Sequence, residues 1–109
     1  MTPRELRSLR ALAQLRAERS GRDLAVYRGR IAALEARRAT LTDQPLQAPE
    51  TLAEAAAQDR WLRWRAAELS QLSLAAARLH AAAQPQREAH ARDRARSEVI
   101  DRLIGSGKA

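Results

Sequence analysis

The sequence predicts an all-α protein: a long antiparallel two-helix coiled-coil hairpin with a C-terminal helical arm. Alanine supplies most of the 45% of residues that are hydrophobic, and alanine is the strongest helix former. The aromatic and β-branched residues that favour strands are scarce, with no Phe and one Tyr. One proline-rich break separates two long stretches of helical spacing. A single helical-hairpin domain therefore accounts for residues 1–109.

The first helix is predicted over residues 3–42. Thr2 and Glu5 have the spacing of a capping box, and Pro3 fits the first helical position. Apolar and small residues then recur mostly at steps of three and four, which places them on one face of the helix. These residues are Leu6, Leu9, Ala13, Ala17, Ser20, Leu24, Tyr27, Ile31, Leu34 and Leu41. This face is expected to pack against the second helix.

Residues 43–49 are predicted to form the loop, because Pro45 and Pro49 stop a helix and stiffen the chain. The second helix is predicted over residues 50–84. Its packing face holds Leu52, Ala55, Ala56, Leu62, Leu69, Leu72, Ala76, Leu79 and Ala83. Helices joined by a short loop usually pack antiparallel, so residue 42 is placed opposite residue 50 and facing residue numbers sum to about 92.

The arm is predicted over residues 86–104. The same register places Pro85 where the paired hairpin ends. Residues 86–98 contain nothing more apolar than alanine and are predicted to be a solvated helix. An apolar patch follows, and the hairpin offers it no partner. Its four residues, Val99, Ile100, Leu103 and Ile104, are therefore predicted to bind a partner.

Positive charge is concentrated in the first helix. The chain has a net charge of +7, and residues 1–42 hold ten arginines against four acidic residues. Arg4, Arg7 and Arg10 form one row at i,i+3 spacing, but the arginines together coat most of the surface outside the packing face. A solvated surface or a docking surface for an acidic protein explains them better than nucleic acid, whose contacts usually gather on one face.

Trp61 and Trp64 flank the packing face of the second helix. They either shield a thin, alanine-rich interface or present one ring as an anchor for a partner, since Trp is enriched in interface hot spots. With Arg4, Arg7, Arg10 and the apolar patch of the arm, they complete the set of predicted partner-binding residues.

No catalytic, cofactor-binding or metal-binding residue is predicted, and the chain is not expected to be an enzyme. It has no Cys and no Gly-rich phosphate loop, and its two histidines, His80 and His90, lack metal-ligand spacing. No apolar run approaches the roughly 20 residues of a membrane span. A cytoplasmic protein without membrane insertion, peripheral at the inner face of the membrane at most, is expected.

Four stretches resemble FliJ/YscO-type proteins, the helical-hairpin stalk components of flagellar and injectisome type III export. They are LRALAQLRAE (residues 9–18, followed by Leu24), IAALEARR (31–38), WLRWR (61–65) and REAHARDRAR (87–96). The resemblance implies a cytoplasmic hairpin that inserts into the ring of a hexameric export ATPase and contacts the export gate or escorts chaperones. It implies no catalytic residues.

The favoured hypothesis is a coiled-coil adaptor or stalk that docks on this larger assembly and assists substrate export. Two alternatives stay open. A basic helical protein associated with nucleic acid would bind DNA or RNA with strong salt dependence. A self-assembling structural rod would pair the apolar patch of the arm with its own copy in a homodimer.

Overall fold

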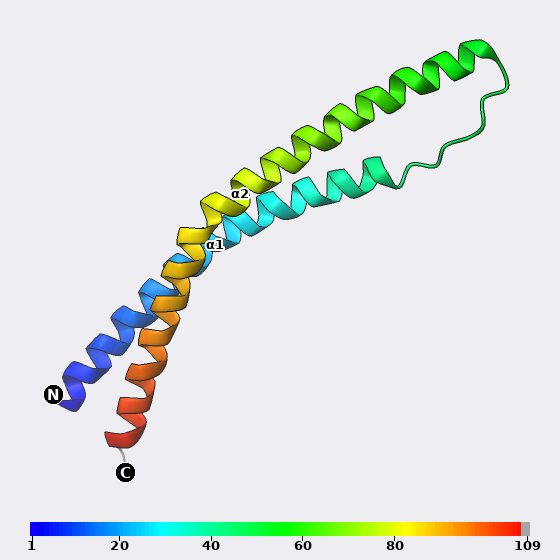
Figure 1. The fold of residues 1–109 in the computed structure, drawn as a ribbon. Helices are drawn as coiled ribbons and strands as arrows, with labels where there is room; N and C mark the ends of the chain where they lie inside the picture. Colours follow the sequence, from blue (N-terminus) through cyan, green and yellow to red (C-terminus); the bar gives the residue numbers. More distant parts are fainter. Residues whose placement is uncertain (108–109) are drawn as a thin grey trace. The chain divides into compact units, whose positions relative to one another are not determined.

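The computed structural model describes residues 1–107, which form two helices joined by a loop (Figure 1). Helix α1 spans Pro3–Thr42, as the sequence predicts, and helix α2 spans Leu52–Gly107. The part of the chain that the structure describes contains no strand, which confirms the all-α helical hairpin. The helices contribute to two compact units. The first unit pairs Met1–Arg28 with α2 from Ala82 onward, and the second unit is Gly29–Ala81.

Capping residues define where each helix begins. At the start of α1, the Thr2 amide donates to Glu5 Oε2 at 3.0 Å and the Glu5 amide donates to Thr2 Oγ1 at 3.1 Å. This is the predicted capping box. Before α2, the Glu54 amide donates to Thr51 Oγ1 at 3.1 Å, so Thr51 is the N-cap. The second helix therefore begins at Leu52, two residues later than predicted.

The register of the first unit differs from the predicted one. Ser20 Oγ and His90 Nδ1 form a hydrogen bond of 3.1 Å between the helices. Nearer the N-terminus, Arg10 Nε lies 3.0 Å from Asp101 Oδ1 in an ion pair. Facing residue numbers therefore sum to about 110, not 92. The first half of α1 pairs with the segment predicted to overhang, and the prediction of an unpaired arm is wrong.

The register of the second unit is displaced in the same direction, with facing residue numbers that sum to about 105. Arg65 Nη1 donates to the Leu41 carbonyl at 3.4 Å, and Arg37 Nη2 lies 3.7 Å from Glu68 Oε2. The last turn of α1 thus lies beside Arg65, well inside α2, and not beside residue 50.

The loop explains this displacement. Residues 43–51 run alongside the first turns of α2, where Gln58 Nε2 donates to the Gln47 carbonyl at 2.8 Å (Figure 1). An extended chain advances about 3.3 Å per residue against about 1.5 Å in a helix. Each extended residue of the loop therefore spans the length of about two helical residues of α2. The predicted register assumed a tight reversal, whereas the segment that contains Pro45 and Pro49 is extended, a conformation that proline also allows.

Pro85 lies inside α2 and does not end it. The contact face continues beyond the proline through half-buried residues at steps of three and four, namely Gln86, His90, Asp93, Ser97, Ile100 and Ile104. The prediction of a fully solvated segment over residues 86–98 is wrong, because polar side chains occupy the contact face there.

The core is thin. Its buried residues are Ala13, Ser20, Leu24, Leu41, Leu72, Ala76 and Ala83, all of which belong to the predicted packing faces. Leu24 is the largest fully buried side chain, with 2% of its surface exposed. Other members of those faces, such as Leu6 and Leu69, are half-buried. The predicted faces are correct apart from Leu9, Leu52 and Ala56, which are exposed, and the larger error lies in how the faces are paired.

The two glycines inside α1 provide a matched test of the helix contact. A Cβ at Gly29 would meet nothing within 4 Å, so Gly29→Ala is expected to stabilise the protein by roughly 0.5–1 kcal/mol through helix propensity. A Cβ at Gly21 would lie 3.1 Å from His90 Cε1. Gly21→Ala should therefore gain less than Gly29→Ala, or destabilise, in urea unfolding followed by circular dichroism.

His90→Ala supplies the control for this comparison. Without the imidazole ring, Gly21→Ala is expected to recover the full helix-propensity gain seen at Gly29. Equal effects of the two glycine substitutions in the wild-type background would contradict the close contact between Gly21 and His90.

A candidate protein-binding groove

An apolar groove lies between the two helices of the first unit. Leu9, Leu12 and Ala13 line it from α1, and Ala95, Val99 and Ile100 line it from α2. The cavity has a volume of about 520 Å³. Two helices bury only the stripe where they touch, and no third element covers the flank of this contact in the described chain. Large side chains on the flank therefore face solvent.

The groove exposes side chains that proteins usually bury. Leu12 is 55% exposed and Val99 is 49% exposed. Leu9 and Leu103 are exposed as well, and Leu103 lies one helical turn beyond Val99. Single exposed apolar residues are ordinary, but several in one groove make the groove a candidate binding site.

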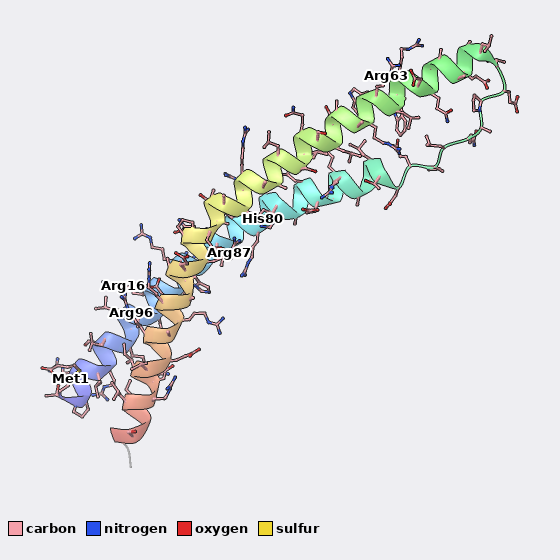
Figure 2. All side chains as sticks on the ribbon, viewed as in Figure 1. Met1, Arg16, Arg63, His80, Arg87 and Arg96 are labelled. Atoms are coloured by element: carbon pink, nitrogen blue, oxygen red, sulfur yellow. The ribbon has the colours of Figure 1, made fainter. Side chains whose placement is uncertain are left out.

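Charged residues line one end of the groove. Arg16 of α1 and Arg96 of α2 belong to its lining, together with Asp93 (Figure 2). Both arginines are exposed, and neither forms an ion pair within residues 1–107. By helical spacing, the Arg10–Asp101 ion pair lies on the opposite flank of the helix contact, so it leaves the groove open.

The structure brings part of the predicted apolar patch into this groove. Val99 and Ile100 line it, and Leu103 extends the exposed surface along α2. Ile104 is half-buried. The patch is thus apolar and partly exposed, but it lies beside the start of α1 and not on a free arm.

The predicted arginines of the first helix take different positions. Arg4 and Arg7 are exposed, and Arg4 lines a shallow hollow with Met1, Leu9 and Leu12 at the start of α1. Arg10 holds Asp101 and so contributes to the pairing of the helices. The row of three arginines is therefore not a uniform docking surface.

The tryptophans belong to the second unit and do not line the groove. Trp61 is half-buried and lines a polar cavity beneath loop residues 44–50. The Arg65 guanidinium lies 4.9 Å from the centre of the Trp61 ring, within the range of a cation–π contact. Trp64 is exposed. Trp61 thus has a structural role beside the loop, and Trp64 is the ring that solvent reaches.

Leu12, Arg16 and Arg96 were not among the predicted site residues, and Leu9 was assigned only to the packing face. A signal for them exists in the sequence. Leu9 and Leu12 are three residues apart, so the apolar stripe of α1 is wider here than one partner helix covers. Recognising the groove also required the correct register, which places Val99 beside this widened stripe.

Other kinds of site find little support in the described chain. Residues 1–107 contain no group of three or more His, Cys, Asp or Glu side chains that could hold a metal ion. Neither of the two helices is apolar enough over a sufficient length to cross a membrane.

Comparisons of the chain with protein-family models, with curated proteins and with solved structures found no match. The resemblance to FliJ/YscO-type proteins therefore depends on the four stretches quoted above.

Proposed function

We propose that this chain is a non-enzymatic helical adaptor that binds a larger protein assembly through the groove of its first unit. The observation that carries the proposal is the exposure of Leu9, Leu12 and Val99 in one apolar groove. An interface that buries such side chains gains roughly 25 cal/mol per Å² of apolar area removed from water.

We further propose the type III export apparatus as this assembly. The resemblance of residues 9–18, 31–38, 61–65 and 87–96 to FliJ/YscO-type proteins supports it and makes a hexameric export ATPase the first partner to test. The chain would then act as a stalk that docks on the ATPase and assists substrate export.

Affinity capture from native lysate tests this function. The full chain serves as bait at about 150 mM salt, where weak electrostatic contacts are screened, with and without nuclease. We expect a hexameric ATPase or an export-gate subunit to be recovered in both samples. If nuclease abolishes the recovery, the adaptor hypothesis is contradicted and nucleic-acid binding takes its place. If a nuclease-resistant assembly without export components is recovered, the adaptor hypothesis stands but the export apparatus is not its partner.

A further inference from the structure

We propose that the groove of the first unit binds an amphipathic helix of another protein, with acidic residues beside the apolar stripe of that helix. This inference rests on the proposed adaptor function and names the chemistry of the partner. The bound helix would complete a three-helix bundle over Leu9, Leu12, Val99 and Ile100.

The spacing of the apolar side chains fits a helix as the occupant. Leu9 and Leu12 are three residues apart on α1, and Val99 and Leu103 are four residues apart on α2. Each pair therefore lies on one face of its helix, and the two antiparallel pairs form the walls of one groove. An apolar stripe on a third helix can pack its side chains between such rows.

The charge of the first unit favours an acidic partner. Residues 1–28 and 82–107 contain twelve arginines against seven acidic residues, a difference of +5. At the groove itself, Arg16 and Arg96 face one carboxylate, that of Asp93. A Glu or Asp one turn beyond the apolar stripe of the bound helix would reach these guanidinium groups, which lack an ion-pair partner among residues 1–107.

The same charge argues against a second copy of the chain. A homodimer through this groove would place a unit of net charge +5 against another of the same charge. Both copies would also bring Arg16 and Arg96 to the interface. Like charges in close contact disfavour association, whereas an acidic helix removes the repulsion.

Fluorescence anisotropy with a designed peptide tests the inference on the full chain. The probe is a labelled peptide of about 18 residues, or five helical turns, with Leu on one stripe and Glu on both sides of it. One control peptide scrambles the order of the residues, and the other replaces each Glu with Gln. We expect the Glu peptide to bind about tenfold more tightly than the Gln peptide, and the scrambled peptide not to bind.

Variants of the chain locate the bound peptide. Leu12→Gln with Val99→Gln is expected to weaken binding at least about tenfold, because both side chains line the groove. Leu15→Gln with Val26→Gln is the matched control, since these residues are 59% and 54% exposed and lie outside the groove. Arg16→Gln with Arg96→Gln should abolish the preference for Glu over Gln, whereas Arg22→Gln with Arg94→Gln should preserve it.

Several results would overturn the inference. They are equal binding of the scrambled peptide, equal binding of the Glu and Gln peptides, and unchanged binding by the groove variants. Sedimentation that shows a dimer, disrupted by Leu12→Gln with Val99→Gln, would assign the groove to a second copy. The outcome is separable from the proposed function. If the groove variants leave lysate capture unchanged, the adaptor function is supported but the groove is not its binding site. If the peptide binds specifically but no assembly is captured after nuclease treatment, the groove binds a helix and the adaptor function is contradicted.

Discussion

Leu24→Ala is expected to lower the free energy of unfolding by about 3 kcal/mol and to lower the midpoint of thermal unfolding. Leu24 is 2% exposed and is the largest fully buried side chain. Truncating such a side chain loses the free energy gained by burying its methyl groups and leaves a cavity. Together these effects typically lower the stability by about 2–5 kcal/mol. Small domains have total stabilities of about 5–15 kcal/mol, and this core holds only three buried leucines beside small residues, so the loss is a large share.

Thermal unfolding monitored by circular dichroism at 222 nm measures this effect. Leu15→Ala is the matched control, because Leu15 lies on the same helix and is 59% exposed. We expect it to change stability by less than about 0.5 kcal/mol, as surface substitutions usually do. Equal losses from Leu24→Ala and Leu15→Ala would show that the contact face of α1 has been assigned incorrectly.

Pro85→Ala is expected to stabilise the protein by about 2 kcal/mol. Proline lacks the amide hydrogen that would bond the carbonyl of Ala81, and its ring crowds the preceding turn. Replacing it inside a helix gains about 3 kcal/mol, from which up to about 1 kcal/mol is lost because alanine leaves the unfolded chain freer. Pro85 lies within α2, so the full helical penalty applies. Hydrogen exchange should show greater protection around Ala81 and Pro85.

Pro3→Ala is the control for this substitution. Pro3 is the first residue of α1, where the amide hydrogen would have no helical acceptor, so the proline carries little penalty there. We expect Pro3→Ala to leave the unfolding midpoint nearly unchanged or slightly lower. A Pro85→Ala protein no more stable than wild type would mean that α2 does not continue through residue 85 in solution.

The fold class and the bounds of α1 could be predicted because they depend on local signals. The reciprocal bonds of Thr2 and Glu5 follow from residues three apart, and the packing face from steps of three and four. The start of α2 was also readable, because Thr51 and Glu54 repeat the capping-box spacing. The prediction takes Pro49 as the signal for the helix start and therefore begins the helix at residue 50, two residues before Leu52.

The pairing of the helices could not be predicted from these signals. It depends on whether the loop reverses tightly or runs extended along α2, and both conformations suit Pro45 and Pro49. Between Pro85 and Val99, the contact face is also polar, at His90, Asp93 and Ser97, and this stretch gives no hydrophobic signal. The groove joins two segments that only the correct pairing brings together. The sequence therefore predicts a binding surface at the patch on α2 but not at its neighbours Leu9 and Leu12.

The pairing of the first unit also has a consequence for the order of folding. Ser20 and His90 are 70 residues apart in the chain, whereas Leu41 and Arg65 in the second unit are 24 apart. Closing the longer loop has the larger entropic cost, and contacts between distant residues form late. During synthesis, α1 emerges with its first turns unpaired until residues beyond Ala82 leave the ribosome. The groove is thus the last surface to be assembled, and a nascent chain acquires the proposed partner-binding site only when both helices have been made.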